Sequence, residues 1–187
     1  MSNNNILSVL ENHPLIPVVT FQEMDEIEPI IEKLLEKNIN CIEVTLRTSV
    51  AMEAIQRIKR TFSSELTIGA GTVTSQNQIV KLKDINVDFV VSPGTTHELL
   101  TKLIESELPF ITGVSTPSEI LLGVQQNCRV FKFFPANLFG GTAALKAYAQ
   151  IFPDVLFCPT GGISEETYKD YLSLPNVVSV GGSWMLK

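Results

Sequence analysis

A lysine lies inside a phenylalanine-rich stretch, VFKFFPAN (130–137), and it is the first sign of chemistry in this sequence. Lysine is rarely buried unless a partner neutralises it or a reaction uses its amine. A buried neutral amine is a nucleophile, whereas a buried amine beside a carboxylate can be a structural ion pair. Lys132 taken alone is therefore compatible with either role.

A second stretch, CIEVTLR (41–47), supplies partners for this lysine. Side chains alternate across a β-strand, so one face of this stretch is apolar and suits packing under helices. The opposite face carries Cys41, Glu43, Thr45 and Arg47. The same alternation in VFKFFP places Lys132 opposite the two phenylalanines that flank it. A carboxylate, a guanidinium and an amine that converge on one interior favour a reactive site over an isolated ion pair.

The elements that must position these residues are short apolar runs separated by amphipathic ones. Eight strand candidates begin 21–26 residues apart, a spacing that allows one strand and one helix per unit. The strand candidates are residues 15–21, 41–46, 66–71, 88–93, 109–114, 130–135, 155–161 and 176–182.

Capping residues mark the starts of several of the intervening helices. Asp25 is expected to cap the first and Ser75 the third. Two pairs match a capping box, Thr95 with Glu98 and Thr116 with Glu119, and Ser164 is expected to open the last helix.

This alternation predicts an α/β fold, a (β/α)8 TIM barrel in a single domain over residues 1–187. A doubly wound open sheet is the competing architecture, but eight even units without a break favour the barrel. Only SWMLK follows the last strand, so the eighth helix is expected to be missing or truncated. Three explanations are open: the N-terminal segment Asn5–Glu11 covers the resulting gap, a neighbouring subunit covers it, or the natural chain continues. We favour one of the two covers.

Polar residues and glycines gather at the carboxyl ends of the candidate strands, where barrel active sites lie. Glycines after the last two strands commonly bind phosphate through backbone N–H groups. Besides Glu43, Arg47 and Lys132, this rim carries Thr72, Pro93, Thr160, Gly161, Gly162, Gly181, Gly182 and Ser183.

Composition limits the partners of such a site. The net charge of −6 argues against nucleic acid or an anionic membrane as the main partner. No apolar run approaches the roughly 18 residues of a membrane span, and the N-terminus does not resemble a signal peptide. Three cysteines without a CxxC pattern indicate free thiols in a reducing compartment, which predicts a cytoplasmic protein.

Six motifs, in order along the chain, resemble the bacterial 2-dehydro-3-deoxyphosphogluconate aldolases, which also act as 4-hydroxy-2-oxoglutarate aldolases. They are EVTLRT (43–48), GAGTV (69–73), SPG (92–94), FKFFPA (131–136), FCPTGGIS (157–164) and GGSW (181–184). The resemblance covers residues 15 to about 184, and FKFFPA together with CPTGGIS is highly specific. It implies a class I aldolase barrel, usually trimeric, that needs no metal and no other cofactor and acts on a small 2-keto acid.

The resemblance also implies roles for individual residues. Lys132 matches the Schiff-base lysine and Glu43 the carboxylate that transfers protons, while Arg47 and Thr72 match the residues that hold the pyruvyl carboxylate. Other matches are Pro93 with a substrate-lining turn, Thr160 with a position that influences stereochemical preference, and Gly161, Gly162 and Ser183 with the phosphate end. This chain has Asn137 where relatives commonly have glutamate, and we expect little catalytic consequence.

Other classes of function stay open at this stage. A metal-dependent pyruvate aldolase would need carboxylate or histidine ligands at the strand ends, where this sequence offers mainly Glu43. A non-catalytic phosphate-binding barrel would keep the glycines but would not need Lys132 to face Glu43. A related pyruvate aldolase with a different sugar-acid substrate would keep all of these residues.

Overall fold

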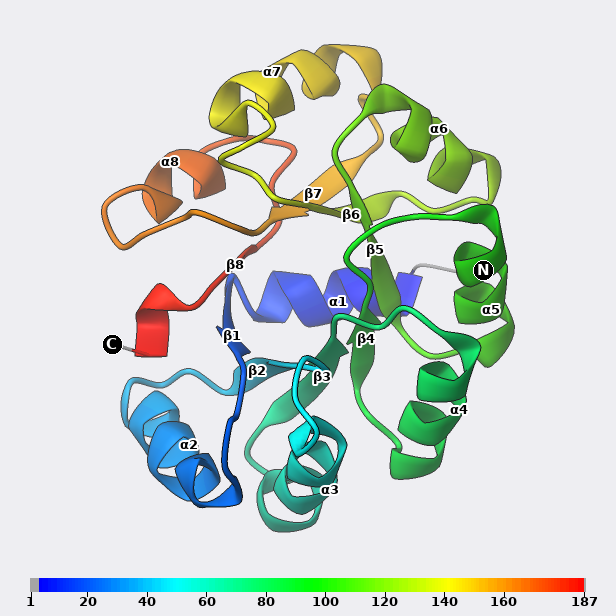
Figure 1. Ribbon diagram of the computed structural model, residues 1–187. Helices are drawn as coiled ribbons and strands as arrows, with labels where there is room; N and C mark the ends of the chain where they lie inside the picture. Colours follow the sequence, from blue (N-terminus) through cyan, green and yellow to red (C-terminus); the bar gives the residue numbers. More distant parts are fainter. Residues whose placement is uncertain (1–3, 187) are drawn as a thin grey trace.

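The computed structural model describes residues 4–186, which form a ring of parallel strands surrounded by helices (Figure 1). The strands are β1 (Leu15–Val19), β2 (Cys41–Thr45), β3 (Thr67–Gly71), β4 (Phe89–Val91), β5 (Phe110–Val114), β6 (Val130–Phe133), β7 (Leu156–Pro159) and β8 (Val180–Gly182). Each predicted strand is present at its predicted place, shortened by up to four residues at its ends. The chain thus has the predicted (β/α)8 architecture.

Helices alternate with the strands, and all but the first cover the outside of the ring. They are α1 (Asn4–Asn12), α2 (Ile27–Glu36), α3 (Ala51–Phe62), α4 (Gln76–Ile85), α5 (His97–Ser106), α6 (Pro117–Gln125), α7 (Gly141–Ile151) and α8 (Tyr168–Leu172). Between residues 4 and 186, none of these helices combines the length and the apolar character needed to cross a membrane.

The strands pair in the order β7-β6-β5-β4-β3-β2-β1-β8, and each pair is parallel. Two isolated bridges, Phe157 with Val177 and Thr160 with Gly181, join the two ends of this order. The sheet is therefore closed, and the open-sheet alternative is wrong.

Helix caps agree with the sequence where the helix starts directly after its capping residue. Ser75 caps α4 and Thr116 caps α6, each with a complete capping box. Other caps were predicted at the wrong residue. Glu23 caps a short 3-10 turn that contains Asp25, and α8 begins four residues after Ser164.

The predicted capping box of Thr95 and Glu98 is also wrong. Thr96 caps α5 and accepts a hydrogen bond from the backbone N–H of Leu99. The hydroxyl of Thr95 instead donates to the carbonyl of Gly113 at 2.7 Å. The helix begins one residue later than predicted, because the Thr95 hydroxyl is bonded to Gly113 of β5 and does not cap the helix.

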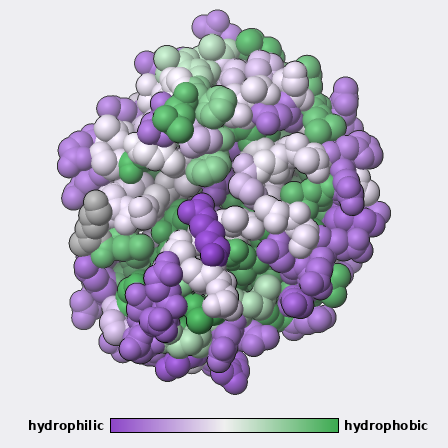
Figure 2. Space-filling model, in the orientation of Figure 1, coloured by the Kyte–Doolittle hydropathy of each residue, from purple (hydrophilic) through white to green (hydrophobic). Residues whose placement is uncertain are grey.

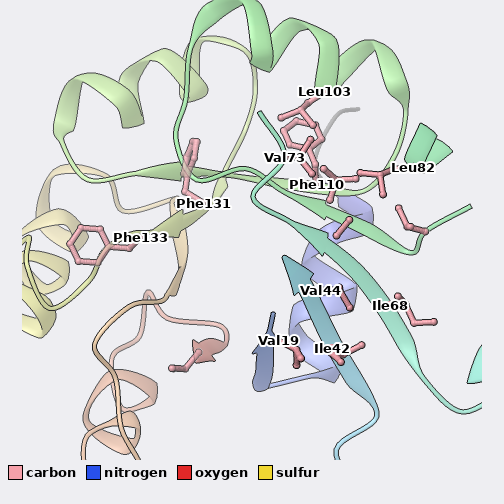
Figure 3. Packing of buried hydrophobic residues seen from close by; sticks show 14 of the residues in the cluster. Val19, Ile42, Val44, Ile68, Val73, Leu82, Leu103, Phe110, Phe131 and Phe133 are labelled. Atoms are coloured by element: carbon pink, nitrogen blue, oxygen red, sulfur yellow. The ribbon is translucent and has the colours of Figure 1, made fainter. Parts of the chain in front are cut away.

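Two apolar clusters hold the fold together. The larger lies between the strands and the helices, where the outward-facing residues of the strands meet the helices (Figure 3). The smaller fills the barrel interior and contains Ile6, Leu10, Ile16, Cys41, Phe89, Val91, Ile111, Val130 and Cys158. Because Ile6 and Leu10 belong to α1, this helix closes the amino-terminal end of the barrel, and Figure 1 shows it lying across the ring.

Of the two covers expected for the gap after β8, a neighbouring subunit stays a prediction, whereas the N-terminal segment is wrong. That segment forms α1, whose apolar face is used by the barrel interior. In the described residues, β8 is followed only by a 3-10 turn, Trp184–Leu186. The Trp184 ring stacks on Tyr168 at 5.8 Å, and Lys33 and Lys37 of the α2 side donate to the carbonyls of Leu186 and Met185.

Candidate active site

Lys132 of β6 and Glu43 of β2 meet inside the barrel, as the strand alternation predicts. The amine Nζ lies 3.1 Å from Oε1 and 3.4 Å from Oε2 of the carboxylate. Both residues are nearly inaccessible, with 4% of Lys132 and 3% of Glu43 exposed. Removing two charges from water is costly, so a pair this deep needs either a strong structural reason or a use.

Neighbouring glycines make room for this pair. A Cβ at Gly71 would lie 2.1 Å from Oε1 of Glu43, so only glycine leaves the carboxylate in place. Gly113 is the register partner of Lys132 on β5, and a Cβ there would lie 2.2 Å from the carbonyl oxygen of Pro93. Gly71, in the GAGTV motif, therefore shapes the site directly.

The surroundings of the amine are partly aromatic and partly polar. Nζ of Lys132 lies 5.1 Å from the centre of the Phe134 ring, over its face. Cys158 is the register partner of Lys132 on β7. Burial raises the pKa of the Cys158 thiol to about 11, so it stays a thiol at neutral pH, as expected of a core residue. The lysine amine is therefore the candidate nucleophile of this interior.

Arg47 and Thr72 come together at the rim. Nε of Arg47 donates to Oγ1 of Thr72 at 3.1 Å. The backbone of Thr72 has φ +59°, a conformation that a β-branched residue adopts only under strain. This strained turn places the hydroxyl within hydrogen-bond distance of the guanidinium, and a guanidinium beside a hydroxyl is suited to binding an anion.

A cavity of about 250 Å³ opens at this end of the barrel. It is smaller than the roughly 300–1,000 Å³ typical of sites for drug-sized ligands, and so it suits a small metabolite. Arg47 is the charged side chain in its wall, which favours an anionic ligand. The lining residues are Val18, Thr20, Arg47, Phe134, Thr160, Gly161, Gly162, Ile163, Gly182 and Ser183.

The glycine turn after β7 requires glycine for its backbone. Gly161 and Gly162 have φ of +100° and +68°, in the left-handed region that other residues avoid. The turn is fixed by the segment after β6, since Ala136 and Asn137 donate backbone hydrogen bonds to Thr160 and Gly161. Gly161 and Gly162, held by these hydrogen bonds, form one side of the cavity.

The residues predicted at the end of β8 divide into two kinds. Gly182 and the exposed Ser183 line the cavity, whereas Gly181 lies beneath Thr160. A Cβ at Gly181 would lie 2.5 Å from Oγ1 of Thr160. That Oγ1 is buried, with no hydrogen-bond partner among the described residues.

Pro93 stands apart from the cavity wall, in a turn against Gly113. The turn is held by hydroxyl groups, because Ser92 and Thr112 each donate to the carbonyl of Gly94, at 2.9 and 3.0 Å. Since Gly113 pairs with Lys132, this turn lies directly beside the amine. The predicted position of Pro93 near the substrate is compatible with this geometry.

Larger hollows lie elsewhere on the surface and contain none of these residues. One of about 830 Å³ lies between α3 and α4, and another of about 500 Å³ lies beside Trp184, in the gap after β8. Figure 2 shows hydrophilic side chains over much of the periphery of the molecule. The site is therefore identified by its charged and polar side chains and not by the volume of the cavity.

Four residues of the cavity wall were not predicted: Ile163, which follows the glycine turn, and Val18, Thr20 and Phe134, which follow the strand alternation. Their signal was available, because the alternation that placed Lys132 inside also places Phe134 there. The same alternation along β1 groups Ile16, Val18 and Thr20 on the inner face. Between residues 4 and 186, no three histidine, cysteine, aspartate or glutamate side chains come together as a group that could hold a metal ion.

Comparison with known proteins gives a consistent result. A family model described as KDPG and KHG aldolase matches residues 6–187. The KHG/KDPG aldolase of Escherichia coli K12 is 41% identical over 179 residues, which are 96% of this chain and 84% of that protein. The 2-dehydro-3-deoxy-phosphogluconate aldolase of Pseudomonas aeruginosa is 43% identical over 172 residues, 92% of this chain and 78% of that protein.

Among solved structures, one of the similar proteins holds a reaction intermediate. It is the KDPG aldolase of Legionella pneumophila, crystallised with pyruvate captured at low pH as a covalent carbinolamine. It superposes on this chain with a TM-score of 0.92 and 44% sequence identity, over 95% of this chain and 86% of that one.

Proposed function

This chain belongs to the KDPG and KHG aldolase family, and on that premise we propose that it is a class I aldolase whose Schiff base forms on Lys132. Its substrates are 2-dehydro-3-deoxy-6-phosphogluconate (KDPG), cleaved to pyruvate and glyceraldehyde 3-phosphate, and 4-hydroxy-2-oxoglutarate (KHG), cleaved to pyruvate and glyoxylate. The observation that carries the proposal is the buried contact of 3.1 Å between Nζ of Lys132 and Oε1 of Glu43, below an anion-binding cavity.

The first step joins the amine to the substrate. Glu43 accepts a proton from the Lys132 ammonium, and the freed lone pair attacks the C2 carbonyl to give a carbinolamine. Loss of the C2 oxygen as water, with a proton returned by Glu43, leaves an iminium. The distance of 3.1 Å allows direct proton transfer between the two side chains.

The second step breaks the carbon–carbon bond. Glu43 removes the proton of the C4 hydroxyl, and the electrons of the C3–C4 bond move to the iminium nitrogen. The aldehyde leaves, and an enamine of pyruvate stays on Lys132. Glu43 returns the proton to C3 of the enamine, and water releases pyruvate and the free amine. One carboxylate thus moves every proton, which explains why the site places it against the lysine.

The remaining residues bind and orient the substrate. We assign Arg47 and Thr72 to the C1 carboxylate, since they form a cation–hydroxyl corner joined by a hydrogen bond of 3.1 Å. We assign Thr160, whose side chain borders the cavity, to the reacting carbons, and Pro93 to the side next to Gly113. Gly161, Gly162, Gly182 and Ser183 receive the far end of the substrate, where KDPG carries its phosphate.

We also propose that the protein works in the cytoplasm as a homotrimer. Free buried cysteines at positions 41, 128 and 158 agree with a reducing compartment. The trimer is implied by the family resemblance, and size-exclusion chromatography with light scattering measures it directly. A monomeric mass at micromolar concentration would overturn this part of the proposal.

Turnover in the presence of EDTA tests the proposed function against its alternatives. Pyruvate release from KDPG and from KHG is followed with lactate dehydrogenase and NADH, before and after treatment with EDTA. We expect both substrates to be cleaved and the rates to be unchanged by EDTA. Loss of activity with EDTA, restored by a divalent ion, would indicate a metal-dependent aldolase, and binding of KDPG without cleavage would indicate a non-catalytic barrel.

A further inference from the structure

Thr20 follows the last residue of β1 and lines the cavity, although no motif points to it. Its hydroxyl lies 2.6 Å from the hydroxyl of Thr45, at the carboxyl end of β2. The register of the two strands pairs Val18 with Glu43, so the next inward-facing residues are Thr20 and Thr45. The two hydroxyls therefore lie one layer above the catalytic carboxylate.

The two hydroxyls have unequal surroundings. Thr45 is completely buried, and its Oγ1 has no other hydrogen-bond partner among the described residues. Thr20 is half-buried and borders the cavity. A hydroxyl donates one hydrogen bond and accepts up to two. Because a buried donor must be satisfied, Thr45 donates to Thr20, and the O–H of Thr20 is free to point into the cavity.

The position of Thr20 matches the middle of the substrate. Lys132 and Glu43 take the carbons around C2 to C4, while the glycine turn and Ser183 receive the far end. Thr20 lies in the same cavity wall as Arg47 on one side and Gly182 with Ser183 on the other. A substrate whose far end reaches the glycines therefore lies in the same cavity as Thr20.

We propose that Thr20 is a specificity-determining residue that hydrogen-bonds the C5 hydroxyl of the phosphorylated sugar acid, and that Thr45 positions it. This inference rests on the proposed function. KDPG and KHG have the same groups from C1 to C4, but C5 bears a hydroxyl in KDPG and is a carboxylate carbon in KHG. The Thr20 oxygen can also accept a second hydrogen bond, which the C5 hydroxyl of KDPG can donate and the C5 carboxylate of KHG cannot. Thr20 therefore distinguishes the two substrates beyond the bond that is cleaved.

The alternative is that the hydroxyl pair only ties β1 to β2. A structural tie would affect both substrates alike, because its loss would loosen the rim for either. The chain offers a matched control for this role. Thr48 Oγ1 donates to the carbonyl of Phe21 at 2.8 Å, so it holds the loop after β1 without lining the cavity.

The test compares kcat/KM for KDPG and KHG in Thr20→Val, which keeps the shape of the side chain and removes its hydroxyl. We expect kcat/KM for KDPG to fall roughly 3- to 10-fold, the effect of one neutral hydrogen bond, with KHG changed less than about twofold. Thr20→Ser should restore the wild-type ratio. Thr45→Val should lower the ratio in the same direction, and Thr48→Val should leave it unchanged.

Trapping of pyruvate with borohydride, performed on each variant, separates the possible failures. A normal pyruvyl adduct with an unchanged substrate ratio in Thr20→Val would overturn this inference alone. An equal loss for both substrates would overturn it too and assign the pair to structure. Absence of the adduct in the wild-type protein would overturn the proposed function and this inference with it.

Discussion

The two ends of the barrel interior have opposite chemistry, although the same strands build both. At the amino-terminal end, Ile6 and Leu10 of α1 pack against apolar side chains such as Phe89 and exclude water. At the carboxyl-terminal end, Lys132 and Glu43 form a buried ion pair beneath an open cavity. The difference shows how one core can be stable at one end and reactive at the other.

The change occurs within single strands. Along β2 the inward residues run from Cys41 to Glu43 and Thr45, and Arg47 follows at the rim. Burial raises the pKa of the Cys41 thiol, which stays protonated and acts as a small apolar side chain. Apolar packing at the closed end offsets the free-energy cost of burying Lys132 and Glu43 one layer above it. Substitutions at the closed end should therefore affect stability, and those at the reactive end should affect catalysis.

The largest expected effect is at the reactive end. Glu43→Gln keeps the size of the side chain but removes the group that moves protons, so we expect kcat to fall about 10²- to 10⁴-fold. Circular dichroism should show a folded protein, because glutamine fills the same space beside Gly71. Wild-type turnover in this variant would make Glu43 a structural partner of Lys132 and would remove the contrast between the two ends.

The closed end should give the reverse result. Leu10→Ala leaves a cavity below the ion pair, and we expect the free energy of unfolding to fall by about 2–5 kcal/mol. The kcat of the protein that remains folded should stay within twofold of wild type. Ser8→Ala, an exposed change on the same helix, is the control, with an effect of at most about 0.5 kcal/mol. A large loss of kcat in Leu10→Ala would show that the two ends are coupled.

A smaller effect on substrate binding is expected at Thr72, whose strained backbone places its hydroxyl beside Arg47. Thr72→Gly relieves backbone strain of about 1–3 kcal/mol in the folded protein. Glycine also gives the unfolded chain more conformational freedom, which lowers the free energy of unfolding by about 0.4–1 kcal/mol. We therefore expect stability to rise by about 1 kcal/mol, measured by urea unfolding. The KM for both substrates should rise roughly tenfold, because Arg47 loses the acceptor that orients it.

Thr72→Ser is the control that separates backbone strain from the hydrogen bond of Arg47, since it keeps the hydroxyl and most of the strain. We expect its KM to stay near that of the wild type. If Thr72→Gly binds both substrates normally, the hydrogen bond from Arg47 has no part in binding the carboxylate.

Much of this arrangement could be predicted from the sequence, because alternation along a strand is a strict geometric rule. It placed Lys132 opposite Glu43 across 89 positions of sequence, and the distance of 3.1 Å confirms it. The strands were found for the same reason, since each is a short apolar run buried on both faces. The capping box of Thr116 was found because side chain and helix start are adjacent in the chain.

What could not be predicted depends on contacts between distant segments. The face of α1 that enters the barrel is apolar, but nothing in its sequence says whether it covers the side or the end. Thr95 was assigned to a cap because its competing acceptor, the carbonyl of Gly113, lies 18 positions away. Alternation along β1 places Thr20 on the inner face, but its contact with Thr45 depends on the register of the two strands, which only the folded sheet sets.

The central claim is that the amine of Lys132 is the nucleophile, and trapping with pyruvate and borohydride tests it most directly. Reduction of the iminium fixes the pyruvyl group to the lysine, and mass spectrometry of the digested protein locates it. We expect one adduct, on Lys132, in the wild-type protein, and neither adduct nor cleavage in Lys132→Ala. An adduct of undiminished yield in Lys132→Ala, or one on another residue of the wild-type protein, would contradict the account.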